Sequence, residues 1–125
     1  MKINIGIIGF GRMGRFYLDE IQKNGHYEVS YICDVNADAR AVAQEKSPSS
    51  KVVSDENIVF DDDKVQAVVL CALANSRKEQ IEHAIRKDKH VISEKPIADT
   101  VDREWEVVDA VEKWEKRARY LQINL

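Results

Sequence analysis

The sequence is poor in the residues that mark special architectures. Its 125 residues include two cysteines, two prolines and five glycines, and aromatic side chains make up only 7%. So little cysteine excludes a disulfide scaffold, and so little glycine and proline excludes a collagen-like or low-complexity chain. No apolar run is long enough to cross a membrane, and the N-terminal segment lacks the basic region and cleavage site of a secretory signal. We therefore expect a cytoplasmic protein that does not enter a membrane.

The chain also lacks a strong excess of charge. Its 19 Lys and Arg residues face 22 Asp and Glu residues, which gives a formal net charge of −3. This balance offers no electrostatic attraction to nucleic acid or to an anionic membrane, so we expect neither as a partner. A chain of this length with 44% hydrophobic residues can form one core of its own. We interpret residues 1–125 as a single domain, which is small for an enzyme that must hold both a cofactor and a substrate.

Short apolar runs alternate with helical segments along the whole chain, which is typical of stacked βαβ units. We expect strands at residues 3–8, 28–33, 51–54, 65–72, 90–93 and 120–125. Helices are expected at about residues 13–21, at 37–46 after an N-cap at Asn36, at 77–87 and at 100–118 after an N-cap at Thr100, with one helical turn within 55–64. The pattern predicts an α/β Rossmann fold, a doubly wound parallel sheet in three layers with strand order 3-2-1-4-5-6.

The last expected helix has two different apolar sides. One stripe faces the sheet and consists of Val107, Ala110, Val111, Trp114 and Ala118. Val101 and Trp105 point to the opposite side. We interpret Trp105 either as part of a contact with another domain or subunit, or as a side chain covered by local loops.

Residues 9–14 form a G-x-G-x-x-G motif that follows an expected strand and opens an expected helix. Asp34 ends the second strand, twenty residues beyond the last glycine of the motif. This spacing is typical of a dinucleotide-binding turn. Gly9 would allow the tight turn, Gly11 the close approach of a pyrophosphate, and Gly14 the close packing of helix and sheet. The alternative is a glycine-rich turn without a ligand, next to a solvated aspartate.

The same segment predicts which dinucleotide is bound. Free backbone N–H groups around Arg12 and Met13 would face the phosphates. Asp34 would accept hydrogen bonds from the ribose hydroxyls of adenosine and repel a 2′-phosphate, which favours NAD over NADP. Arg40 lies close enough along the chain to offset part of that repulsion, unless it is only a solvated helix charge.

Three segments resemble the glucose-fructose oxidoreductase/inositol dehydrogenase family of NAD(P)-dependent oxidoreductases. They are residues 9–14, residues 33–36 (CDVN) and residues 89–96 (KHVISEKP), and the last is similar to the family signature G-K-H-V-x-x-E-K-P. The resemblance covers essentially the whole chain, but only the cofactor-binding half of the family, so we expect the substrate domain to be absent. It implies hydride transfer between nicotinamide and a hydroxyl-bearing carbon of a sugar, cyclitol or similar polyol. It also implies that the full-length protein is a homo-oligomer and that the isolated domain binds cofactor without catalysis.

The resemblance implies roles for particular residues. Lys95 would be catalytic, because the matching lysine lies near the nicotinamide and orients the reacting hydroxyl or tunes the proton relay. Glu94 would lie beside the nicotinamide ribose. The predicted cofactor-binding residues are Gly9, Phe10, Gly11, Arg12, Met13, Gly14, Asp34, Ala72, Leu73, Asn75 and Glu94, and no metal site is expected. The chain departs from the family pattern at Arg77, where a histidine is usual, and at Asp88, where a glycine is usual.

Two other functions compete with this interpretation. A non-catalytic dinucleotide-sensing regulatory domain would have little need of Lys95. A protein like glyceraldehyde-phosphate dehydrogenase would share the opening pattern of residues 9–15, but not the E-K-P segment at residues 94–96. The histidines His26, His83 and His90 have no spacing typical of a catalytic triad or a metal site, and the cysteines Cys33 and Cys71 are expected to be unpaired apolar fillers.

Overall fold

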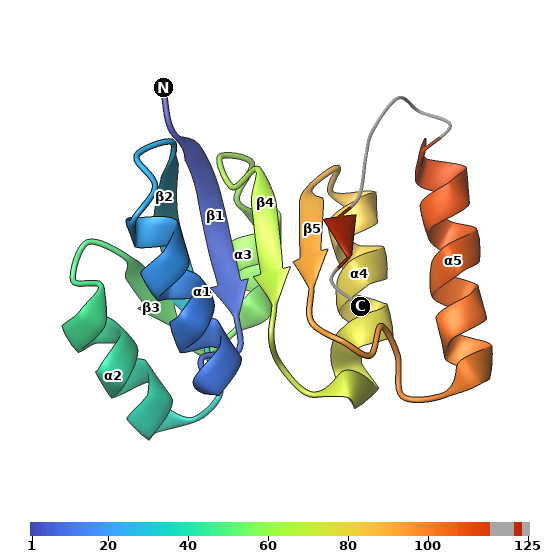
Figure 1. Cartoon of the computed structure of the whole chain (residues 1–125), viewed down its shortest axis with the longest axis horizontal. Helices are drawn as coiled ribbons and strands as arrows, with labels where there is room; N and C mark the ends of the chain where they lie inside the picture. The colour runs from blue at the N-terminus through green and yellow to red at the C-terminus, as the bar shows by residue number, and fades with distance from the viewer. Residues whose placement is uncertain (116–121, 124–125) are drawn as a thin grey trace.

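The fold is a parallel sheet with helices on both faces (Figure 1), and the computed structural model describes residues 1–115 and 122–123. Within these ranges, six strands follow the order β3-β2-β1-β4-β5-β6, and all paired neighbours run parallel. The strands are β1 (Ile3–Ile8), β2 (Tyr27–Cys33), β3 (Lys51–Val53), β4 (Ala67–Leu70), β5 (His90–Ser93) and β6 (Gln122–Ile123). The predicted Rossmann topology is therefore confirmed.

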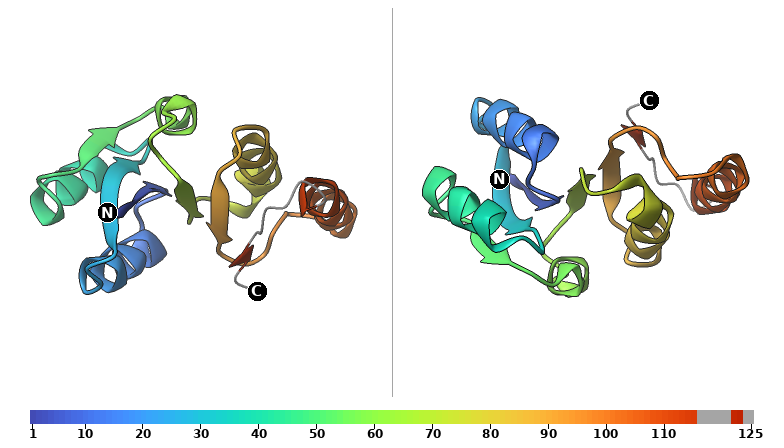
Figure 2. Two further views of the ribbon diagram at one scale, coloured as in Figure 1. Left: turned by 90° about the horizontal axis from the view of Figure 1, so that it is seen from above. Right: turned by 90° about the horizontal axis from the view of Figure 1, so that it is seen from below.

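The helices form the outer two of the three predicted layers. They are α1 (Arg12–Gln22), α2 (Ala37–Lys46), α3 (Glu56–Asp61), α4 (Ala74–Arg86) and α5 (Val101–Glu115). One apolar cluster joins the sheet to α1 and α2 through Leu18 and Ala43. A second cluster joins it to α3, α4 and α5 through Phe60, Ile81 and Trp114. Figure 2 shows these two groups of helices on opposite faces of the sheet.

Short polar side chains begin several of the helices. Asn36 accepts a hydrogen bond from the N–H of Ala39 at 2.9 Å, and the hydroxyl of Thr100 accepts one from the N–H of Arg103 at 3.2 Å. Both predicted caps are confirmed. They satisfy backbone donors that the first turn of a helix leaves without an internal partner.

Some element boundaries differ from the prediction. Helix α4 begins at Ala74 and not at Arg77, because Leu73 is extended and the helix starts directly after it without a capping side chain. Strand β4 is shorter than the expected 65–72, and α3 takes the place of the single turn expected within 55–64. The predicted end of the last helix at Ala118 lies outside the described residues, as do residues 120, 121, 124 and 125 of the expected last strand.

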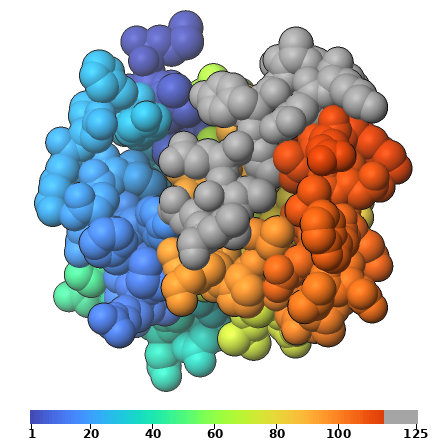
Figure 3. All heavy atoms as spheres, turned by 45° about the vertical axis from the view of Figure 1, so that its right-hand side comes forward, coloured from blue at the N-terminus to red at the C-terminus, as the bar shows by residue number. Residues whose placement is uncertain are grey.

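Helix α5 has the two sides that its sequence predicts. Val107 and Trp114 are fully buried, and Ala110 and Val111 pack against the same core, whereas Ala118 lies outside the described residues. On the opposite side, Trp105 is 68% exposed. Helix α5 forms one flank of the molecule in Figure 3. None of the helices in the described ranges combines the length and the apolar composition that a membrane span requires.

Asp88 ends helix α4 in a left-handed conformation, with φ of +58°. The N–H of Asp88 donates to the carbonyl of Ile85, and the N–H of Lys89 donates to that of Ala84, which is the Schellman pattern of helix termination. Glycine is the usual residue at this position, because other residues are strained there. The Asp88 carboxylate also accepts a hydrogen bond from the indole N–H of the buried Trp114 at 3.1 Å. This bond gives a physical reason for an aspartate where the family has glycine.

Substitutions of Asp88 should separate these two effects. Alanine keeps the strain and leaves the indole N–H of Trp114 unpaired, so we expect Asp88→Ala to lower the free energy of unfolding by about 2 kcal/mol. Asp88→Gly loses the same bond but relieves the strain, and should be about 1 kcal/mol more stable than the alanine variant. Urea denaturation measures both, with Asp88→Asn as a control close to the wild type. Equal stability of the alanine and glycine variants would contradict the strain.

Candidate functional site

The candidate site lies at the edge where β1, β2 and β4 end side by side, at the bottom of Figure 1. In the strand register, Ile8 pairs with Cys33 on one side and with Leu70 on the other, so the three following loops leave the sheet at the same level. A cleft of about 580 Å³ opens between these loops. Open α/β sheets bind their ligands at this edge.

The three glycines of the turn serve two different purposes. Gly9 has φ of +93°, and a Cβ atom there would lie 2.6 Å from the backbone nitrogen of Ala72. A Cβ on Gly14 would lie 2.2 Å from the carbonyl oxygen of Gly9, so the first turn of α1 rests directly on the loop. A Cβ on Gly11 would meet no atom within 4 Å. Gly9 and Gly14 are required by the fold, whereas Gly11 keeps open a space that the fold itself does not fill.

The start of α1 offers backbone donors to this open space. Gly11 is the N-cap, no side chain caps the helix, and its first turn contains no acidic residue. The N–H groups of the first turn, around Arg12 and Met13, have no partner inside a helix. They carry the positive end of the helix dipole, so this terminus can bind an anion such as a phosphate.

Asp34 follows β2 and is bonded to the glycine turn itself. One carboxylate oxygen accepts from the N–H of Phe10 at 2.7 Å, and the other accepts from the N–H of Asn36 at 2.9 Å. These bonds fix the carboxylate, while each oxygen still has capacity for a second donor. The guanidinium of Arg40 donates to the carbonyls of Asp34 and Val35, both at 3.0 Å. Arg40 is half-buried, and these two bonds hold its guanidinium beside Asp34.

Two exposed apolar side chains line the same cleft. Val35, after β2, is 86% exposed, and Leu73, after β4, is 75% exposed. Their loops leave the sheet on opposite sides of β1. The cleft is also lined by Glu56 and Gln80, and the Gln80 amide donates to the Glu56 carboxylate at 3.0 Å. The cleft thus combines apolar walls, a carboxylate and backbone donors, which suits a flat ring carrying sugar and phosphate groups.

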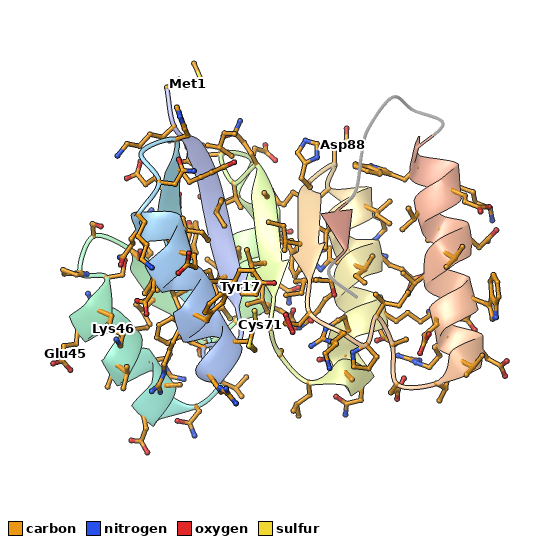
Figure 4. All side chains as sticks on the ribbon, viewed as in Figure 1. Met1, Tyr17, Glu45, Lys46, Cys71 and Asp88 are labelled. Carbon is orange, nitrogen blue, oxygen red and sulfur yellow. The ribbon has the colours of Figure 1, made fainter. Side chains whose placement is uncertain are left out.

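The loop after β5 carries the remaining predicted residues. Glu94 accepts a hydrogen bond from the hydroxyl of Tyr17 at 3.3 Å, and Tyr17 points from α1 towards this loop (Figure 4). Lys95 is exposed and precedes a cis peptide bond to Pro96. Lys95 does not line the large cleft but lines a neighbouring hollow of about 480 Å³, which it shares with Trp105.

Comparison with known proteins identifies the family of this chain. The sequence profile of a family described as "Oxidoreductase family, NAD-binding Rossmann fold" matches residues 3–122. The chain belongs to this oxidoreductase family. It is 30% identical over 119 residues to an inositol 2-dehydrogenase of Paracoccus denitrificans, a match that covers 94% of this chain and 35% of the relative. A myo-inositol 2-dehydrogenase of Thermotoga maritima is 29% identical over 96 residues, which covers 77% of this chain and 29% of the relative.

Solved structures of the oxidoreductase family share the fold. The myo-inositol dehydrogenase from Lactobacillus casei, in complex with NAD(H) and myo-inositol, matches with a TM-score of 0.90 at 25% identity, covering 99% of this chain and 37% of that one. The WlbA dehydrogenase from Bordetella pertussis, in complex with NADH and UDP-GlcNAcA, matches with a TM-score of 0.84 at 25% identity, with the same coverage. This chain therefore has the fold of the NAD-binding Rossmann domain of its oxidoreductase family, and it spans about a third of the length of these relatives.

The predicted residues of this oxidoreductase domain fall into separate groups. Those that line the large cleft are Gly9, Gly11, Asp34, Ala72 and Leu73. Phe10 and Gly14 are buried behind the turn, and Arg12 and Met13 lie in the first turn of α1. Asn75 does not line the cleft, and its carbonyl accepts a hydrogen bond from Arg103 at 3.3 Å. Glu94 and Lys95 lie further along the same edge, after β5.

Two basic residues have structural contacts that sequence reasoning missed. Lys89, within the family signature, is buried and donates to the carbonyls of Asp62 and Val65, both at 2.8 Å. Burial lowers the pKa of Lys89 from its ordinary value. Arg77 is buried in α4 and donates to carbonyl groups of two loops. The only sign of this role in the sequence is that Arg77 stands where the family usually has a histidine.

The histidines and cysteines have mainly packing roles. His83 stacks on Phe60 with ring centroids 4.3 Å apart, and His90 meets Trp114 edge-on at 6.2 Å. Cys33 and Cys71 are free thiols at the floor of the cleft, and burial raises the pKa of each to about 12, so they stay protonated. Over residues 1–115 and 122–123, no three histidine, cysteine or acidic side chains gather into a possible metal site.

Proposed function

We propose that this chain is the NAD-binding domain of a dehydrogenase that acts on a hydroxyl-bearing carbon of a sugar, cyclitol or related polyol. Alone, the domain binds NAD and turns over no substrate. The observation that carries this proposal is the single cleft that joins the open space at Gly11, the uncapped start of α1 and the Asp34 carboxylate. The cytoplasmic location and the homo-oligomeric state of the full-length protein stay predictions.

The residues present fit a dinucleotide. The first-turn N–H groups of α1 would hold the pyrophosphate, because Gly11 leaves room for its approach. The carboxylate oxygens of Asp34 can each accept a second hydrogen bond, and they would accept these from the hydroxyls of the adenosine ribose. Val35 and Leu73 would cover the two faces of the adenine ring. Val35 and the apolar contact it provides were not predicted from the sequence.

Lys95 and Glu94 are the residues that we place at the reacting end. The nicotinamide, when bound, supplies the ring carbon that exchanges hydride with the substrate carbon. Glu94, which is held by the hydroxyl of Tyr17, would accept a hydrogen bond from a hydroxyl of the adjoining ribose. Lys95 would hold the reacting hydroxyl by a hydrogen bond and take part in moving its proton.

Binding of NAD by the chain is the direct test. At a concentration one hundred times its Kd, a ligand that binds only the folded state adds about 2.7 kcal/mol of stability. For a domain of this size we expect the melting temperature to rise by about 6–15 °C, because 1 kcal/mol corresponds to several degrees. Differential scanning calorimetry measures the shift. We expect no oxidation of inositols or sugars by the chain alone, since most substrate positioning would come from other parts of the protein.

Two results would contradict the proposal. The first is a melting temperature that neither NAD nor NADP changes, because the cleft would then not be a dinucleotide site. The second is a full-length protein that binds NAD but oxidises no member of a polyol panel. That outcome would favour a non-catalytic dinucleotide sensor, which would use the same cleft without needing Lys95.

A further inference from the structure

Arg77 joins the two loops that follow β4 and β5. Its guanidinium donates to the carbonyl of Ala72 in the first loop, to that of Glu94 at 2.8 Å and to that of Pro96 at 2.7 Å in the second. The residue is only 3% exposed. A buried arginine with a planar set of donors can hold several acceptors in one fixed arrangement. Arg77 therefore sets the distance between these two loops.

The acceptors of Arg77 lie on either side of Lys95. The carbonyl of Glu94 belongs to the peptide bond between Glu94 and Lys95. The carbonyl of Pro96 belongs to the residue that directly follows Lys95. Both carbonyls are drawn towards α4 by the same cation, so the backbone that carries Lys95 is anchored at both ends. The Lys95 side chain itself is exposed and makes no hydrogen bond to the described residues.

Arg77 forms no close ion pair within the described part of the chain, although the Glu94 carboxylate is near enough to act on its charge. Burial lowers its pKa from the ordinary value, although an arginine remains protonated. A buried charge is costly unless hydrogen bonds compensate it. Here backbone carbonyls accept from the two Nη atoms, whereas the buried Nε has no hydrogen-bond partner among the described residues. The loop positions and the buried cation therefore stabilise each other through the Nη atoms. An ordinary ion pair would leave the loops independent of this residue.

We infer that Arg77 is the positioning residue for the reacting end of the site. It acts through the backbone of Glu94 and Lys95 and does not touch the ligand. This inference rests on the proposed function, in which those two residues face the nicotinamide riboside. The adenosine and pyrophosphate half is held by the glycine turn and Asp34, to which Arg77 makes no hydrogen bond. Two of its three acceptors, the carbonyls of Glu94 and Pro96, lie at the reacting end, and the third, that of Ala72, borders the large cleft. Arg77 should therefore matter mainly for the nicotinamide riboside half of the dinucleotide.

Comparison of NAD with ADP tests this division, because ADP lacks the nicotinamide riboside. We expect Arg77→Met to weaken NAD binding about tenfold in calorimetric titrations, which equals about 1.4 kcal/mol, and to change ADP binding less than twofold. Arg77→Lys keeps a cation but cannot span three carbonyls, so it should restore part of the NAD affinity. Arg86→Met, an exposed arginine on the same helix, is the matched control and should bind both ligands as the wild type does.

The possible results separate the two proposals. If Arg77 has a purely structural role, Arg77→Met would weaken the binding of NAD and of ADP by the same factor, or would lower only the melting temperature. Either result overturns the inference. If Arg77→Met does not fold, the same NAD and ADP comparison in Arg77→Lys decides. A wild-type chain that binds neither ligand overturns the proposed function itself, and the role of Arg77 with it. A selective loss of NAD affinity that lysine partly rescues supports both.

Discussion

Alanine at position 9 is expected to lower the free energy of unfolding by about 3–4 kcal/mol, the largest stability loss we predict for this domain. Two costs add here. The left-handed φ of +93° is strained for any residue with a Cβ atom, which costs about 1–2 kcal/mol. The new Cβ would also lie 2.6 Å from the nitrogen of Ala72 and 2.7 Å from the carbonyl carbon of Cys71, and forcing atoms into a packed region costs about 1–3 kcal/mol. Urea denaturation followed by circular dichroism measures the loss.

Gly11→Ala provides the matched control for this prediction. Its Cβ would enter open space and its φ of −84° is allowed for alanine, so only the preference for glycine over alanine at an N-cap remains, about 1 kcal/mol or less. The same methyl group would occupy the space that we assign to the pyrophosphate, so NAD binding should be lost while the fold is kept. Equal stability of the Gly9→Ala and Gly11→Ala variants would contradict the assignment of different purposes to these glycines.

The features that the sequence predicted well are those encoded within one short segment. The glycine turn and Asp34 are local patterns, and their spacing follows from a strand, a turn and a helix of ordinary length. Strand order followed from the connectivity of βαβ units, which allows few topologies. The stripe of Val107, Ala110, Val111 and Trp114 followed from helical periodicity.

The features that were missed depend on segments distant in the sequence. The carbonyl acceptors of Arg77 are 5, 17 and 19 residues away, and no side-chain pattern marks a backbone carbonyl as an acceptor. Val35 adjoins Asp34, but its contact with the cleft depends on where the loop after β4 lies. The Asp34 carboxylate was predicted to face a ribose, and its bond to the N–H of Phe10 was not, because a loop conformation determines that donor. Asp34 therefore links the candidate site to the glycine turn.

Asp34→Ala is expected to weaken NAD binding by at least about 100-fold. Hydrogen bonds to a charged group are worth about 1.5–3 kcal/mol each, and the carboxylate would lose two ribose hydroxyls at once. The N–H of Phe10 would also lose its acceptor at 2.7 Å, so part of the loss would come from a less ordered turn. Calorimetric titration measures the affinity. Asp38→Ala removes the same charge from an exposed position in the first turn of α2 and should leave NAD binding unchanged.

The Asp34→Ala variant also tests the preference for NAD over NADP. The Asp34 carboxylate would repel a 2′-phosphate, while Arg40 is held 3.0 Å from the carbonyls of Asp34 and Val35 and so lies beside the same place. We expect the wild type to prefer NAD, and Asp34→Ala to lose this preference because NAD weakens while NADP does not. In Asp34→Ala/Arg40→Ala, NADP should bind at least tenfold more weakly than in Asp34→Ala, since the remaining cation near the phosphate is gone. If Asp34→Ala keeps the wild-type ratio of NAD to NADP affinity, the carboxylate is not the group that discriminates, and its main role is to hold the N–H of Phe10.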